Sequence, residues 1–172
     1  NLVGWLKPLA SRLSMPWHVG RHRQVTDAVH AHDGKICLQL LHAGRYAYHP
    51  LSVAPSKVKA PINPFTPRAL PARGVERTIE AYVTAARLAR DGGYDGVEVM
   101  GSEGYLINQF LSARTNRRRD GWGGDVAQRM RFATEIVRRI REACGADFII
   151  IYRLSMLELV PEGSDWNEIV QQ

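Results

Sequence analysis

An α/β fold with parallel strands is predicted by two features of the sequence. Short apolar segments alternate with amphipathic helical segments through most of the chain. The apolar segments are nearly continuous, which is typical of parallel strands covered on both faces. A (β/α)8 barrel and a doubly wound sheet share both features. However, no GxGxxG turn follows a predicted strand, so the dinucleotide-binding sheet lacks its best sign.

Five helices are predicted from apolar residues at helical spacing. The first ends at Gly34 and the fourth at Gly145, since glycine commonly follows a helix. Ser164 is the expected N-cap of the last helix. The predicted helices cover residues 21–32, 75–91, 105–111, 127–143 and 164–172.

Three strands are predicted from runs of apolar residues between these helices. They cover residues 35–41, 94–100 and 147–154. An irregular segment rich in Pro, Ser and Lys is predicted over 46–73. Because this segment is long for a plain connection, we expect it to have a role at the active-site face.

Composition and length fit one soluble globular domain, with 172 residues of which 45% are hydrophobic and 23% charged. No apolar run reaches the roughly eighteen residues of a membrane span. The two cysteines, Cys37 and Cys144, lack a CxxC spacing. We interpret them as small buried residues of a reducing, cytoplasmic protein, and no metal site is predicted.

The formal net charge of +6 comes mainly from arginine. Arg114 and three consecutive arginines, 117–119, lie in SARTNRRRD, on a predicted loop. Basic proteins bind nucleic acids, membrane surfaces or phosphorylated small molecules. The loop lacks the interleaved aromatic residues of a nucleic-acid interface, and an acyl-CoA thioester fits the charge as well. A non-catalytic basic α/β module that binds nucleic acid through 117–119 remains an alternative.

Polar residues interrupt the predicted strands at Gln39, Glu98 and Arg153. Polar side chains within strands are costly unless they are paired, so these three require partners. One interpretation is an internal polar network that they form with one another. The other is a ligand with carbonyl, imide and hydroxyl groups, such as a flavin. A glutamine offers a donor and an acceptor together, and an arginine stabilises negative charge near a reduced flavin N1.

Further candidates follow the strands. Tyr105 lies on a Gly-rich turn, and its phenol, with an ordinary pKa near about 10, is a proton donor for a developing carbanion. A packed tyrosine with a surface hydrogen bond is the alternative. Glu103 is a second acid, a polar orienter or a solvated turn residue. His42, just after the first strand, is either a loop hydrogen-bonder or a wall of the site.

At these residues the sequence resembles the old yellow enzyme family. KICLQLLHAGRY resembles its third barrel strand, DFIIIYRLS its fifth, and GYDGVEVMGSEGYLINQFLSARTNRRRDGWGGDVAQRMRF its fourth strand with the following turn and helix. The resemblance covers residues 17–172 and implies a partial (β/α)8 TIM barrel. Many members have two ligand-contacting His or Asn residues where this chain has Met100 and Glu103. VMGSEGY is instead similar to the 2,4-dienoyl-CoA reductase branch.

The resemblance implies roles for six residues. Gln39 would hydrogen-bond the pyrimidine ring of FMN, and Arg153 would stabilise the reduced flavin. Tyr105 would donate a proton, with Glu103 in the same pocket. Arg114 would hold the substrate, for which His42 is a further candidate. The implied reaction is NADPH-dependent reduction of a conjugated C=C bond, with FAD and a 4Fe–4S cluster carrying electrons to FMN.

Another ene reductase or demethylase of the same flavin family is the alternative activity. The absence of an initiator Met and the mapping onto strands three to five lead us to expect that residues 1–172 are part of a longer chain. A full barrel needs about 250 residues. The phosphate-binding loops and the FAD, 4Fe–4S and NADPH sites would then lie outside this segment.

Overall fold

A three-stranded parallel sheet forms the centre of the computed structural model, which describes residues 3–7, 10–156, 158, 160–161 and 163–171. Its strands are β1 (Cys37–Leu40), β4 (Gly96–Gly101) and β5 (Ile149–Leu154), in the order β1-β4-β5. The three predicted strands and their parallel arrangement are confirmed. The register pairs Gln39 with Glu98, so these two polar residues lie side by side on neighbouring strands.

Helices connect the strands in sequence. They are α1 (Val19–His30), α2 (Ala72–Asp91), α3 (Leu106–Leu111), α4 (Val126–Cys144) and α5 (Trp166–Val170), with short 3-10 turns η1 (Pro16–His18) and η2 (Gly44–Tyr46). All five predicted helices are confirmed, with shifted ends. In the described part of the chain, no helix has both the length and the apolarity needed to cross a membrane.

The predicted N-cap of α5 is wrong by one residue. Asp165, not Ser164, has the extended backbone before the helix, and its Oδ1 accepts a hydrogen bond from Glu168 N at 2.9 Å. Both residue types are good caps. Asp165 is the cap because its side chain, and not that of Ser164, reaches the N–H of Glu168, the third residue of the helix.

The segment between β1 and α2 is not wholly irregular, as the sequence analysis expected. It contains β2 (Val53–Ala54) and β3 (Arg68–Ala69), which pair in parallel. Backbone hydrogen bonds of 2.9 Å run from Arg68 N to the Ser52 oxygen and from Leu70 N to the Ala54 oxygen. Strands of two residues are too short to show an alternating pattern, so periodicity could not reveal them.

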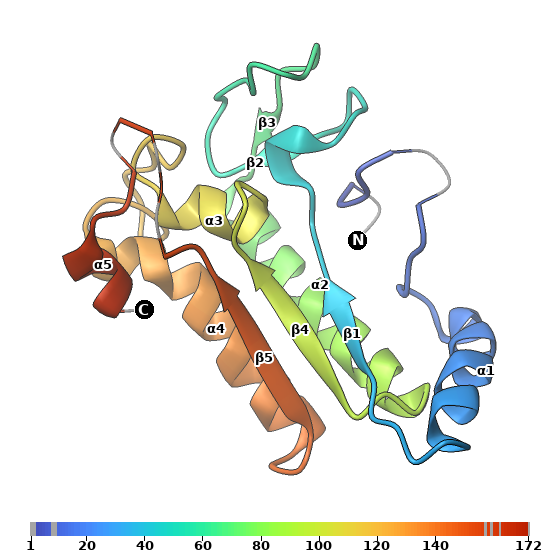
Figure 1. The fold of residues 1–172 in the computed structure, drawn as a ribbon. Helices are drawn as coiled ribbons and strands as arrows, with labels where there is room; N and C mark the ends of the chain where they lie inside the picture. The colour runs from blue at the N-terminus through green and yellow to red at the C-terminus, as the bar shows by residue number, and fades with distance from the viewer. Residues whose placement is uncertain (1–2, 8–9, 157, 159, 162, 172) are drawn as a thin grey trace.

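The hydrophobic core lies between one face of the sheet and helices α2 and α4, which lie behind the strands in Figure 1. Val97 and Val99 of β4 are fully buried against this layer. Phe110 of α3 stacks on Phe132 of α4 with ring centroids 4.1 Å apart. Cys144 is buried in this core as predicted, while Cys37 is only half-buried.

The opposite face of the sheet has no helix over it among the described residues (Figure 1). The expectation of strands covered on both faces is therefore not met within them. Along β5, exposed residues alternate with half-buried ones, and Ile149, Ile151 and Arg153 are the exposed set. Gln39 of β1 is likewise exposed. The predicted polar residues are thus open to solvent rather than enclosed.

Candidate functional site

Four polar side chains meet at the carboxyl ends of the three strands. Gln39 Nε2 donates a hydrogen bond to Glu98 Oε1 at 2.9 Å. Arg153 Nη1 lies 3.8 Å from the same Glu98 oxygen, and Arg153 Nη2 lies 2.6 Å from Glu103 Oε1. We call Gln39, Glu98, Glu103 and Arg153 the strand-end cluster. The strand residues therefore contact one another as one interpretation expected, but Gln39 and Arg153 are exposed, so the network is not internal.

The strand-end cluster remains available to a ligand. The Arg153 and Glu103 side chains are 49% and 51% exposed, so their ion pair contributes little to stability. The amide nitrogen of Gln39 donates its hydrogen bond to Glu98, whereas the amide oxygen of Gln39 accepts none from the described residues. An arginine fork and an amide, held on adjacent strands, can together contact a flat ligand with polar edges.

The turn after β4 is set by two left-handed residues, Glu103 at φ 60° and Gly104 at φ 74°. A non-glycine residue rarely adopts this conformation. Glu103 N donates to Ser155 Oγ at 3.2 Å, which ties this turn to the end of β5. A Cβ at Gly104 would lie 2.7 Å from the Tyr46 ring, so glycine is required there. This turn directs Glu103 toward Arg153.

Tyr105 is the N-cap residue of α3, with an extended backbone that starts the helix directly after the turn. Its ring packs edge-on against Tyr46, with centroids 6.0 Å apart. The side chain is half-buried. Tyr105 therefore lies at the same end of the sheet as the strand-end cluster, on the loop that carries Glu103.

A cavity of about 230 Å³ lies beside this turn, and both Glu103 and Arg114 line it. Arg114 Nη1 donates to the Pro161 oxygen at 3.2 Å, which holds its side chain near the segment after β5. The structure thus brings together two residues that the sequence analysis assigned to one substrate pocket. We call this space the substrate cavity.

Two amide side chains that the sequence analysis missed hold the turn in place. Gln109 is 1% exposed and donates to the Gly104 oxygen at 2.6 Å, while its Oε1 accepts from Arg45 N at 3.1 Å. Asn108 Oδ1 accepts from Gly104 N at 2.6 Å, and its Nδ2 donates to Glu158. The signal was two amides in the otherwise apolar segment LINQFL.

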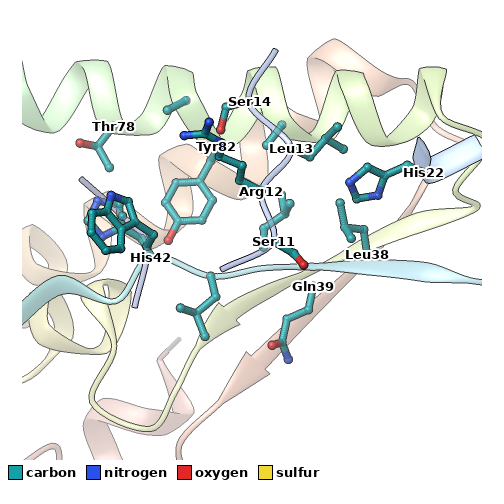
Figure 2. Close-up of a pocket in the computed structure, with 16 residues that line it drawn as sticks. Ser11, Arg12, Leu13, Ser14, His22, Leu38, Gln39, His42, Thr78 and Tyr82 are labelled. Carbon is teal, nitrogen blue, oxygen red and sulfur yellow. The ribbon is translucent and has the colours of Figure 1, made fainter. Parts of the chain in front are cut away.

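His42 lies apart from the strand-end cluster. Figure 2 shows it beside Tyr82 in a different cavity, of about 200 Å³, which Gln39 also lines although its side chain extends to the other side of β1. A Cβ at Gly4 would lie 2.7 Å from its ring, so the N-terminal segment packs closely against it. His42 Nδ1 accepts from Gly44 N at 3.1 Å. The substrate-binding role of His42 stays a prediction, and its burial does not favour it.

Burial also sets the charge of His42. Loss of solvation lowers the pKa of this histidine to about 3, so the ring is neutral near pH 7. Its Nε2 is buried and has no hydrogen-bond partner among the described residues. His42 is therefore a buried, neutral ring that accepts a hydrogen bond from the backbone of the loop after β1, and this contact stabilises the loop.

Known proteins are similar to this chain in sequence and in fold. Residues 8–172 match the NADH:flavin oxidoreductase / NADH oxidase family. The metal reductase of Desulforamulus reducens is 42% identical over 153 residues, which are 87% of this chain and 23% of that protein. This chain therefore spans about a quarter of that relative's length.

Solved structures agree. A complex of 2-naphthoyl-CoA reductase with 2-naphthoyl-CoA superimposes with a TM-score of 0.94 at 30% identity, over 99% of this chain and 28% of the other. An old yellow enzyme homologue from Zymomonas mobilis superimposes with a TM-score of 0.90 at 29% identity, over 99% of this chain and 52% of the other. The likeness to the 2,4-dienoyl-CoA reductase branch stays a prediction, whereas the resemblance to the flavin family is confirmed: the chain belongs to the NADH:flavin oxidoreductase / NADH oxidase family.

Proposed function

We propose that the strand-end cluster binds the isoalloxazine ring of FMN at the open end of a (β/α)8 barrel. The observation that carries this proposal is that Gln39, Tyr105 and Arg153 emerge at one edge of three adjacent parallel strands. Sequential strand order with α2 and α4 on a single face is the arrangement of a barrel wall. In barrel enzymes the active site lies at the carboxyl ends of the strands.

The donor set of the cluster fits a flavin. Gln39 has an amide oxygen without a partner among the described residues, which suits a ring N–H, and an amide nitrogen that suits a ring carbonyl. Arg153 carries a permanent positive charge that favours a negatively charged ring edge. Glu98 and Glu103 orient the guanidinium through contacts of 3.8 and 2.6 Å. FMN, when bound, supplies the hydride-transfer chemistry.

Tyr105 is proposed as the proton donor to the carbon that becomes negatively charged during reduction. It directly follows Glu103 and Gly104, which line the substrate cavity, and this position supports the role because a general acid must reach the reacting atom. Arg114 lines that cavity and would donate to the carbonyl oxygen of the substrate, and Glu103 lines the same cavity.

The proposed substrate is a 2,4-dienoyl-CoA, reduced with NADPH as the electron source. The positive net charge, the VMGSEGY turn and the similarity to a 2-naphthoyl-CoA reductase solved with its CoA thioester support it. In this proposal FAD and a 4Fe–4S cluster belong to other parts of the full-length protein. Another ene reductase or demethylase activity is the second candidate, favoured by the similarity to the old yellow enzyme homologue.

A Tyr105→Phe substitution in the full-length enzyme tests the proton donor. We expect the turnover number for dienoyl-CoA to fall by about 100-fold or more, since general acid catalysis contributes that much. FMN content and the rate of flavin reduction by NADPH should stay unchanged. Tyr48→Phe is the matched control, because Tyr48 is exposed and contacts Phe65 rather than the turn. Wild-type turnover in Tyr105→Phe would refute the assignment.

Substrate preference separates the two candidate activities. We expect kcat/KM for a 2,4-dienoyl-CoA to exceed that for a simple cyclic enone. The reverse order would favour the second candidate.

The flavin site itself is tested by Arg153→Met, which should lower FMN occupancy after desalting. An unchanged flavin absorbance in that variant would contradict the proposed flavin contact.

A further inference from the structure

We propose that a basic hollow beside the substrate cavity binds the phosphorylated adenosine end of a nucleotide substrate. The hollow measures about 530 Å³ and is formed by two loops distant in sequence, 55–58 and 117–120, together with Ala69. The proposal deepens the proposed function and rests on it, because CoA thioesters and NADPH both carry such an end.

Arg118 builds the hollow rather than serving as a free charge. Its side chain is only 8% exposed. Nη1 donates to the Pro55 oxygen at 3.0 Å and also to the Leu70 oxygen, while Nε and Nη2 donate to the Asp120 carboxylate at 2.9 and 2.6 Å. Arg118 therefore fixes one loop against the other, and its charge is neutralised by Asp120.

The charges that remain are those of Lys57, Arg117 and Arg119. All three are exposed and line the hollow. Their side chains make no hydrogen bond or ion pair with any residue that the structure describes, and only the backbone N–H of Arg117 is used, donating to Ser56 Oγ at 2.9 Å. Three like charges facing one space repel one another, and a polyanion relieves that repulsion.

Apolar walls complete the hollow. Pro55, Val58 and Ala69 line it beside the three cations. Phosphate groups suit the cations and an adenine ring suits the apolar walls, since ligand sites combine apolar surface with a few polar groups. Inorganic anions or an extended nucleic-acid backbone would use the cations without needing these walls.

The hollow is close to the substrate cavity. Arg114 lines the cavity and Arg117 lines the hollow. Three residues span at most about 11 Å between Cα atoms, even fully extended. A long substrate can therefore place its reacting end in the cavity and its nucleotide end in the hollow. CoA carries its extra phosphate on the ribose 3′-oxygen, and NADPH carries it on the 2′-oxygen.

The test uses the full-length enzyme with Arg117→Gln and Arg119→Gln combined. The control combines Arg77→Gln and Arg87→Gln, which remove the same charge from exposed positions on α2. We compare kcat/KM for a dienoyl-CoA with that for the same acyl group on N-acetylcysteamine, which lacks the nucleotide. The ratio should fall by about tenfold or more in the first variant, given the strength of charge-assisted hydrogen bonds, and stay constant in the control.

Calorimetric titration with 3′,5′-ADP and 2′,5′-ADP identifies the source and needs neither flavin nor turnover. Tighter binding of 3′,5′-ADP assigns the hollow to CoA. Tighter binding of 2′,5′-ADP assigns it to NADPH, against the expectation that the NADPH site lies outside residues 1–172. Either result supports the proposal if the variant with Arg117→Gln and Arg119→Gln no longer binds that nucleotide. Failure of both nucleotides to bind, equal binding by the variant, or binding of only an oligonucleotide overturns it. Nucleotide binding by an enzyme that reduces no dienoyl-CoA would uphold the hollow and refute the proposed function.

Discussion

Asp95 joins the amino-terminal ends of β1 and β4 through one carboxylate. His30 Nε2 lies 2.9 Å from Oδ2, Ile36 N donates to Oδ2 at 2.9 Å, and Lys35 Nζ lies 3.1 Å from Oδ1. The hydrogen bond from His30, followed by that from Ile36, holds the pKa of Asp95 well below its usual range. A carboxylate with a lowered folded pKa stabilises the protein above its unfolded pKa, and this contribution is lost as the pH falls.

We therefore expect Asp95→Asn to lower the free energy of unfolding by about 1 kcal/mol near neutral pH, through weaker hydrogen bonds. The difference from wild type should shrink as the pH falls below about 3.9, the ordinary aspartate pKa. Urea unfolding at pH 6 and pH 3 measures it. Asp147→Asn, at an exposed position with no ion pair to a described residue, is the control. A difference that stays constant between the two pH values would contradict this account.

Individual residues show what sequence could and could not predict. Gln39, Glu98 and Arg153 stand out because a polar residue in an apolar strand needs a partner, and the structure shows that they contact one another. Gln109 was missed because it sits beside Asn108 in a helix, where a few polar residues among apolar ones are common. Its importance depends on the Gly104 and Arg45 backbone groups that it contacts, and these come close only after folding.

Among the elements, β4 depends on a glycine at its first residue. A Cβ at Gly96 would lie 2.4 Å from the Ile149 carbonyl oxygen and 2.5 Å from the Ile149 Cβ. The register pairs these two residues, so the added methyl group would press directly on β5. Since backbone cannot yield as a flexible side chain does, Gly96→Ala should lower the free energy of unfolding by about 1–3 kcal/mol.

Gly20→Ala is the matched substitution in a helix. Gly20 lies in α1, and a Cβ there meets nothing within 4 Å. Alanine should raise the free energy of unfolding by about 0.5–1 kcal/mol, because glycine loses more backbone freedom on folding. Denaturant unfolding of both variants is expected to shift in opposite directions. If Gly96→Ala were as stable as wild type, β4 and β5 would be able to move apart at this point with no loss of free energy of unfolding.

The long helices were the elements most readily predicted from sequence. In α2, Ile79, Val83 and Ala86 recur at helical spacing, and all three are buried. The pairing of β2 with β3 was not predictable from sequence. Each strand has only two residues, and the pairing joins Val53 to Arg68, which is fifteen residues further along the chain. Sequence periodicity reports long elements that bury one face. Short pairings depend on how the loop is held by its neighbours.

For the molecule as a whole, the uncovered sheet face has the largest consequence. Ile149 and Ile151 are 45% and 44% exposed on it, and Ile151 pairs with Glu98 of the strand-end cluster. Within the described sheet, the outer edges of β1 and β5 pair with no other strand. Exposed apolar surface and open edges promote association between chains. The resemblance to barrel strands three to five implies such open edges, but the sequence does not show which residues are exposed.

A preparation of residues 1–172 alone should therefore self-associate and retain FMN below one equivalent. Light scattering after gel filtration and the flavin absorbance of the desalted protein measure both properties. Combined Ile149→Lys and Ile151→Lys substitutions should reduce association without restoring FMN, since the contacts proposed for the strand-end cluster reach only one edge of the flavin ring. Lysines at exposed Val25 and Val170 add the same charge elsewhere and should change association less. A yellow monomer with stoichiometric flavin would mean that this segment forms a complete flavin site.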